Sequence, residues 1–392
     1  MQNPFERNIT LHYIIASLMW MRFFVPVLAL FYIASQVPLE EFTIIMGVFS
    51  LAILLFEIPT GIIADLIGKK NTLLLSRLCY IAEIYLIAFH NGFWIFLIAK
   101  IISGIGVSLG SGTSSALLFD SLKKLGREKD HKRISGTLHA ITNVSMAFVF
   151  IIGAYLFSLN PKLPAIVSLP LISLGFLLTF FFKEPYPPSK TANLKNFMAH
   201  FKESISMFWK NRHLQYLGLF SLIIAGVIGM ALSLSSVYYK EILIPISLIG
   251  VIAFIGSMLS ALSAKNAHKL EQYWKQKKSL YIIQICVLVA TLLMGLTIGY
   301  IGVLFIFMLQ LTEGFYTVII NDYVNTHAPT SHRATMLSIN NMFDNIGIFI
   351  LLPLLGFSIK AYSLGTAFIF LGILVLVYLI TINIAFRKVI AS

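Results

Sequence analysis

Long apolar runs recur along the whole chain, and most are of the length that crosses a lipid bilayer as an α-helix. A helix needs about 20 apolar residues to cross the hydrocarbon layer, so twelve crossings use roughly 240 residues. The chain supplies nearly that number, because 58% of its 392 residues are hydrophobic and only 11% are charged. No stretch between the runs is long enough to bury a core of its own, which excludes a soluble catalytic domain. We expect an all-α integral membrane protein with twelve transmembrane helices.

The apolar runs form two sets of six, separated by one longer polar stretch. The first set covers residues 11–35, 42–64, 72–89, 93–118, 138–159 and 164–182. The second set covers residues 214–239, 242–264, 280–298, 302–324, 334–359 and 363–386. These runs predict a six-helix bundle over residues 1–182, a linker over residues 183–213 and a second six-helix bundle over residues 214–392.

Lysine and arginine are distributed unevenly between the two sides of the predicted membrane. The two termini and the loops that follow even-numbered runs hold 23 of the 29 Lys and Arg residues, whereas the opposite loops hold only Lys162, Lys240 and Lys360. Cytoplasmic loops of membrane proteins carry the excess of positive charge. We therefore expect both termini in the cytoplasm and the protein in the cytoplasmic (inner) membrane.

The linker combines a proline-rich segment with an amphipathic stretch. Residues 184–188 include three prolines and cannot form a helix. Apolar residues then recur at helical spacing, with lysines elsewhere on the helical wheel. These apolar residues are Leu194, Phe197, Met198, Phe201, Ile205 and Phe208. The pattern indicates an interfacial helix on the cytoplasmic membrane surface, and the alternative is a segment packed under the helical bundle.

Two segments, in the fourth and tenth runs, resemble each other. Gly112 and Asp120 in the fourth run have the same separation as Gly314 and Asp322 in the tenth run. Each segment is followed by a loop that closes on an arginine and then by a run that contains asparagine. Several matches in the same order indicate two pseudo-symmetric bundles related by a parallel repeat, an architecture in which solutes bind between the halves.

The loop after the second run carries a motif of glycines, an aspartate and paired lysines. The motif consists of Gly61, Asp65, Gly68, Lys69 and Lys70. It resembles the signature of the major facilitator superfamily, and the preceding residues 56–60 resemble a bacterial branch of that family with efflux-type members. The resemblance implies that this loop gates the cytoplasmic side and that Asp120 receives Lys69 and Lys70. The alternative is a positively charged anchor with a turn.

The resemblance extends over the whole chain and implies a secondary active transporter that moves a small solute by alternating access. We expect proton-coupled export of a small amphipathic or anionic compound. The alternatives are proton-coupled uptake of an anionic metabolite, and a receptor or assembly factor that keeps the fold without transport. No nucleotide-binding P-loop motif occurs, which excludes ATP hydrolysis by this chain as the driving force. We expect a monomer in the lipid bilayer that is not an enzyme and has no cofactor, metal or nucleic-acid partner.

Ionisable side chains within the predicted helices are few. Because a charge in the bilayer is energetically unfavourable, each is expected to have a polar partner or a function in transport. Arg22, Glu83 and Lys100 lie at similar depth in the first, third and fourth runs. Since the third and fourth runs are antiparallel neighbours, Glu83 and Lys100 are expected to form a structural ion pair. That pair leaves Arg22 as the least compensated cation, which can bind an anionic group of the solute or pair with Glu57.

The second half of the chain carries two acids within its apolar runs, Glu313 and Asp344. A carboxyl in a partly dry site can change its protonation state as access alternates, so both are candidates for proton coupling, with Glu57 as a third. The alternative for these acids is a polar contact between helices that involves the neighbouring asparagines. The candidate solute-binding residues are Arg22, Gln310 and Asn341.

Overall fold

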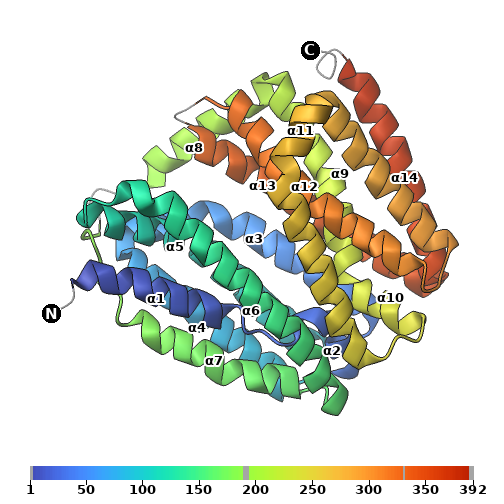
Figure 1. Cartoon of the computed structure of the whole chain (residues 1–392), viewed down its shortest axis with the longest axis horizontal. Coiled ribbons are helices and arrows are strands. Elements are labelled where there is room, and N and C mark those ends of the chain that lie inside the picture. The colour runs from blue at the N-terminus through green and yellow to red at the C-terminus, as the bar shows by residue number, and fades with distance from the viewer. Residues whose placement is uncertain (1–2, 189–193, 330–331, 388–392) are drawn as a thin grey trace. The chain divides into compact units, whose positions relative to one another are not determined.

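The computed structural model describes residues 3–188, 194–329 and 332–387 of the chain, and every regular element in these ranges is a helix (Figure 1). Nine helices in the described ranges are long and apolar enough to cross a membrane. Two shorter apolar helices, Val25–Ala34 and Leu163–Thr179, occupy predicted runs as well. The all-α class of membrane protein predicted from the sequence is confirmed.

The helices follow the predicted runs closely. In the first half they are α1 (Pro4–Met19), η1 (Val25–Val27), α2 (Leu28–Ala34), α3 (Leu39–Ile67), α4 (Lys69–Phe89), α5 (Phe93–Lys124), η2 (Glu128–Asp130), α6 (His131–Leu159) and α7 (Leu163–Thr179). In the second half they are α8 (Leu194–Lys210), α9 (Arg212–Ser233), α10 (Ser235–Glu241), α11 (Ile246–Leu296), α12 (Gly302–His327), α13 (Arg333–Ala361) and α14 (Leu364–Ala385). Each of the twelve predicted runs falls on a helix.

The chain divides into two compact units. The first unit comprises residues 1–37, 52–194 and 245–254, and the second comprises residues 38–51, 195–244 and 255–392. The first unit thus takes one short segment from the second half of the sequence, and the second unit takes one short segment from the first half.

The first predicted run is not one continuous helix, because the backbone leaves the helical path between α1 and η1. The cause is Pro26, which has no N–H to donate to the carbonyl of Arg22 and whose ring clashes with that carbonyl in a regular helix. The freed N–H of Phe23 donates to Ser168 Oγ at 2.9 Å. The expectation of an unbroken first span is therefore wrong.

Gly153 gives this break the space that it needs. A Cβ atom at Gly153 would lie 2.0 Å from the carbonyl oxygen of Phe23, so any larger residue would push the broken segment away from α6. Irregular backbone at membrane depth is tolerated only where protein or a cavity surrounds it. Gly153 on α6 and Ser168 on α7 together provide that surrounding.

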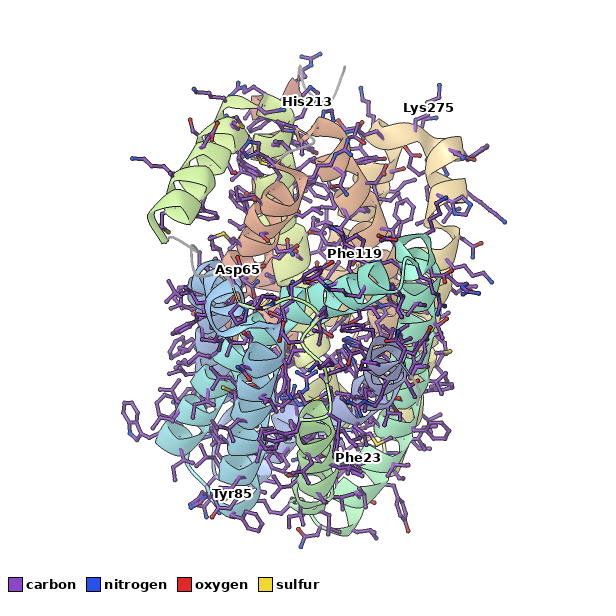
Figure 2. The ribbon with its side chains drawn as sticks, turned by 90° about the vertical axis from the view of Figure 1, so that its left-hand side faces the viewer. Phe23, Asp65, Tyr85, Phe119, His213 and Lys275 are labelled. Carbon is purple, nitrogen blue, oxygen red and sulfur yellow. The ribbon has the colours of Figure 1, made fainter. Side chains whose placement is uncertain are left out.

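Helix α11 contains two of the predicted runs, which are separated by one residue outside the helical conformation. Lys275 has φ 59° and ψ 168°, and the backbone on both sides of it is helical. The predicted loop between residues 264 and 280 is therefore mostly helix. Figure 2 shows Lys275 and His213 at the same end of the second unit.

Helix α8 forms where the amphipathic pattern predicts it, and its C-terminal part packs against protein. Phe208 is fully buried and stacks on Phe343 of α13, with ring centroids 5.6 Å apart. Ser204 hydrogen-bonds His332 Nδ1 at 2.8 Å, whereas Met198 is 45% exposed. The side chains of Leu194 and Phe197 lie outside the described residues. Location of this helix on the membrane surface stays a prediction.

Candidate functional site

The motif loop after α3 is a tight turn that starts α4. Gly68 has φ 88°, a conformation that L-residues with a side chain rarely adopt, and it precedes the first helical residue, Lys69. Asp65 and Phe119 lie toward one end of the first unit, and Tyr85 lies at the opposite end (Figure 2). The loop and the C-terminal part of α5 therefore share one end of the unit, which we call the Asp65 end.

Two carboxylates hold the start of α4. Asp120 forms an ion pair with the Lys69 ammonium group. Glu184 accepts hydrogen bonds from the backbone N–H groups of Lys69 at 3.1 Å and Lys70 at 2.7 Å. These N–H groups have no partner inside the helix, and a carboxylate at a helix N-terminus is favourable. The first residues of the linker are thereby fixed on the motif loop.

The structure brings together some of the predicted gate residues but not all. Within the described residues Asp120 has an ion pair with Lys69 but none with Lys70, so the expectation that it receives both lysines is met only for Lys69. Asp65 is exposed, and within the described chain it has no ion-pair partner. Gly61 lies within α3, and its surroundings fall outside the described residues.

We predict that Glu184→Ala lowers the stability of the protein by about 1 to 2 kcal/mol, because two N–H groups at the start of α4 lose a charged acceptor. The unfolding temperature of the purified protein measures this effect. Glu203→Ala, which removes an exposed acid from α8, is the matched control and should leave that temperature unchanged. Equal unfolding temperatures for the two variants would show that Glu184 does not hold the helix start.

Glu83 is the centre of a buried charge cluster in the first unit. Its carboxylate accepts from Arg22 Nη2 at 2.5 Å, from Lys100 Nζ at 2.7 Å and from Ser103 Oγ at 2.7 Å. The Arg22 guanidinium also lies over the Tyr80 ring, 5.1 Å from its centroid. Two cations therefore share one carboxylate at the level of the helix break.

This geometry corrects the prediction for Arg22. Glu83 and Lys100 are in contact, but Glu83 also accepts from Arg22, so Arg22 is not left uncompensated. The reason is that the break at Pro26 releases Arg22 from a regular helix, a feature that the apolar pattern does not reveal. The partner proposed for Arg22 as an alternative, Glu57, is partly buried on α3 and makes a contact of its own.

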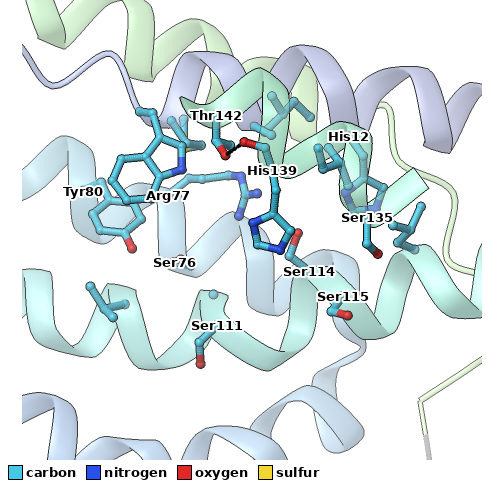
Figure 3. Close-up of a pocket in the computed structure, with 18 residues that line it drawn as sticks. His12, Ser76, Arg77, Tyr80, Ser111, Ser114, Ser115, Ser135, His139 and Thr142 are labelled. Atoms are coloured by element: carbon cyan, nitrogen blue, oxygen red, sulfur yellow. Dashed lines mark hydrogen bonds between the residues drawn. The ribbon is translucent and has the colours of Figure 1, made fainter. Parts of the chain in front are cut away.

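A cavity of about 450 Å³ lies within the first unit (Figure 3). Its walls come from α1, α4, α5 and α6, and they include many hydroxyl groups. The labelled residues that line it are His12, Ser76, Arg77, Tyr80, Ser111, Ser114, Ser115, Ser135, His139 and Thr142. On the α6 side, the Thr142 hydroxyl donates to the His139 carbonyl at 2.9 Å.

The residue that the sequence reasoning missed is Arg77. It lies about 12 Å along α4 from the first residue of that helix, and it is only 6% exposed. Helical spacing places Arg77 one turn from Leu73, whose carbonyl accepts from Arg77 Nη1 at 3.1 Å. A cation within a predicted transmembrane run was the available signal, but the sequence does not show that α1, α5 and α6 leave a cavity next to it.

Asp344 belongs to a hydrogen-bond network in the second unit. Its Oδ1 accepts from the Tyr316 hydroxyl at 3.0 Å, and that hydroxyl lies 2.8 Å from Ser221 Oγ. Asn340 Nδ2 donates to the same Ser221 oxygen at 3.1 Å. Asp344 thus takes part in polar contacts that join α9, α12 and α13.

Glu313 lies one turn before Thr317 on α12 and is partly buried. The Thr317 hydroxyl donates to the Glu313 backbone carbonyl, but the Glu313 carboxyl has no ion pair or hydrogen bond within the described residues. Gln310 packs on Gly256, and its buried Oε1 has no hydrogen-bond partner. Asn341 is exposed on α13. Glu313 is thus a partly buried acid whose carboxyl has no polar partner among the described residues.

The two segments of the internal repeat have different surroundings. A Cβ atom at Gly314 would lie 2.0 Å from the carbonyl oxygen of Ser260, whereas nothing lies within 4 Å of the same position on Gly112. Asp120 has its lysine partner, but Asp322 is exposed and has no ion pair in the part of the chain that the structure describes. The charged contact at the Asp65 end is therefore not repeated at Asp322.

Apolar helices that cross the membrane many times, with charges and a cavity buried among them, define a helical membrane transporter. The chain belongs to the Major Facilitator Superfamily, whose family model matches residues 11–352. Members of this family carry small solutes across membranes. Within the described ranges, no group of three or more His, Cys, Asp or Glu side chains is arranged to hold a metal ion.

Relatives in sequence include transporters and resistance proteins. The MFS-type transporter YxaM of Bacillus subtilis (strain 168) is 22% identical over 376 residues, which cover 92% of this chain and 91% of that protein. The class H tetracycline resistance protein of Pasteurella multocida is 22% identical over 333 residues, which cover 83% of this chain and 80% of that protein. The crystal structure of the nucleoside transporter NupG has a TM-score of 0.79 at 12% identity and covers 98% of this chain and 100% of that chain, which shows the shared fold.

Proposed function

We propose that the protein exports a small amphipathic or anionic solute through the cytoplasmic membrane in exchange for protons. The observation that carries this proposal is the isolated carboxyl of Glu313, which lies on a transmembrane helix with no partner to fix its charge within the described residues. An ionised carboxylate within the membrane is energetically unfavourable, and acids at such positions in membrane proteins usually have a function. We assign to Glu313 the binding and release of a proton during each transport cycle.

The direction of transport is supported by the relatives. Two tetracycline resistance proteins are similar in sequence to this chain, those of class H and class B. Resistance to a compound fits export of that compound from the cell. The sequence-based reason for uptake of an anionic metabolite was an uncompensated Arg22, and the structure pairs Arg22 with Glu83.

Alternating access requires one set of contacts that forms and breaks at each side of the membrane. At the Asp65 end, the ion pair between Lys69 and Asp120 joins the start of α4 to the C-terminal part of α5. The excess of Lys and Arg in the loops of this side supports a cytoplasmic location for this end. We infer that the motif loop is part of the cytoplasmic gate, and that the bundles of residues 1–182 and 214–392 move as the two halves of a monomeric transporter.

Two measurements test the proposed function. In liposomes that contain the purified protein, an imposed pH gradient should drive movement of members of a panel of amphipathic dyes and organic acids. In cells, overproduction should lower the internal amount of the same compounds relative to a deletion strain. Higher internal amounts would indicate uptake. Failure of every compound to move in the liposomes would favour a receptor or assembly factor.

A further inference from the structure

The cavity in the first unit has an unusual balance of charge. None of its 18 lining residues is acidic, whereas Arg77 carries a fixed positive charge and lies in a lining that also includes the imidazoles of His12 and His139 (Figure 3). Arg77 and His12 lie close enough to interact electrostatically. The cavity is therefore a site of positive potential inside a unit whose other buried cations, Arg22 and Lys100, are paired with Glu83.

Arg77 uses only part of its hydrogen-bonding capacity within the protein. Nη1 donates to the Leu73 carbonyl, but the buried Nε has no hydrogen-bond partner. Within the described residues, Arg77 also has no ion pair. The free edge of the guanidinium, formed by Nε and Nη2, is one that can bind two oxygens of a carboxylate or phosphate side by side.

His12, near Arg77, has a second buried polar atom without a hydrogen-bond partner. His12 is 4% exposed, and its Nε2 has no hydrogen-bond partner. Buried polar atoms in proteins are almost always satisfied, so two unsatisfied atoms on residues that line one cavity indicate a ligand with complementary atoms. Figure 3 shows Arg77 and His12 entering the same cavity from α4 and α1.

We propose that this cavity binds a small organic anion, with its oxyanion group on the Nε edge of Arg77 and its remaining polar atoms near His12. The inference rests on the proposed function, because it assigns the chemical class of the transported solute. Arg77 replaces Arg22 in this role, since the charge of Arg22 is already shared with Glu83.

The rest of the cavity indicates what the anion carries besides its charge. Trp20, Tyr80 and Met19 supply flat or flexible apolar surface, and serine and threonine hydroxyls supply hydrogen bonds on the α5 and α6 sides. A second cavity of about 510 Å³ between the broken first span and α6 is lined mainly by apolar side chains and contains no basic residue. An amphipathic anion, such as an aromatic carboxylate, therefore fits the first cavity and not the second.

Binding of anionic probes to the purified full-length protein tests this proposal without any ion gradient. The probes are benzoate, salicylate and phenyl phosphate, and benzamide is the neutral counterpart of benzoate. Binding is followed by the fluorescence of Trp20, which lines the cavity, with Trp20→Phe to assign the signal, and by the rise in unfolding temperature. We expect at least one anion to bind about 30-fold more tightly than benzamide.

Substitutions at the cavity should remove this preference for negative charge. Arg77→Gln should bring the anion to the affinity of benzamide, and Arg77→Lys should keep part of the preference. Ser114→Asp leaves Arg77 in place and supplies an internal competing carboxylate, so it should also remove the preference. Arg133→Gln and Asn91→Asp make the same charge changes at exposed positions of the first unit and should have no effect.

Two outcomes would overturn the proposal: no preference for any of the three anions in the wild-type protein, or a preference that persists in both Arg77→Gln and Ser114→Asp. Neither outcome depends on proton coupling. If gradient-driven transport is present while the charge preference is absent, the proposed function stands and the anion site fails. If the preference is present while no gradient drives transport, the anion site stands and proton coupling fails.

Discussion

Replacement of Glu313 by glutamine is expected to reduce transport driven by a pH gradient to the level of protein-free liposomes. Glutamine has nearly the shape of a protonated glutamate, so helix packing around α12 should be preserved. It cannot release a proton, however, and a carrier that cannot change its protonation state cannot be driven by a proton gradient. Exchange of labelled for unlabelled solute in the absence of a gradient needs no proton release and should survive.

The measurement compares the two kinds of flux in the same liposomes. Asp322→Asn is the matched control, because it removes an exposed acid from the same helix and should leave both fluxes unchanged. Loss of both fluxes in Glu313→Gln would indicate a structural role. Unchanged gradient-driven flux would exclude Glu313 as the proton carrier and make Asp344 the next acid to test.

Asp344 is expected to differ from Glu313 because its hydrogen bonds are already made. Tyr316 donates to its carboxyl, so Asp344→Asn retains an acceptor oxygen for the same hydroxyl. The network then loses charge but not connectivity, and we expect gradient-driven flux to remain measurable in this variant. Tyr316→Phe, which removes the hydroxyl shared with Ser221, should instead lower the unfolding temperature.

The largest loss of stability is expected for Glu83→Gln, about 3 to 5 kcal/mol. The carboxylate is fully buried and is the shared counter-ion of Arg22 and Lys100, so its neutralisation leaves two cations without charge compensation. Removal of one partner from a buried ionic cluster is strongly unfavourable, whereas replacement of a whole pair by apolar groups is often tolerated.

A second substitution tests that explanation. Glu83→Gln combined with Lys100→Met removes one of the two stranded cations and should recover part of the lost stability. The yield of monodisperse protein after detergent extraction and its unfolding temperature are the measurements. Glu241→Gln, at an exposed acid in the second unit, should behave as the wild type. A double variant less stable than Glu83→Gln would contradict the counter-ion role of Glu83.

The apolar pattern was sufficient to predict the fold class and where the helical regions lie along the chain. Periodicity also predicted α8, and the residues of the motif loop were enough to indicate the family. These predictions succeed because a bilayer requires long apolar helices of narrow length range, so one-dimensional patterns carry the information. The ends of several helices differ from prediction, since polar residues such as those before Lys124 continue a helix beyond its apolar part.

The features that were missed depend on contacts between residues far apart in the sequence. Pro26 was visible inside the first run, but its consequence depends on Ser168 and Gly153, which accommodate the broken backbone. Arg77 was visible as a cation in a span, but the cavity beside it is formed by three other helices. Glu184 lies in the predicted linker, and only the fold shows that its carboxylate accepts hydrogen bonds from the first N–H groups of α4.

The broken first span also constrains the order in which the protein can be assembled in the membrane. Its two helical pieces, Pro4–Met19 and Val25–Ala34, are each shorter than the length that crosses the hydrocarbon layer. The Phe23 amide meets its acceptor, Ser168, only after the sixth span has been synthesised. The first span thus completes this hydrogen bond only when the sixth span is present, and nascent chains that end before Ser168 should hold a first span whose Phe23 N–H still lacks its acceptor.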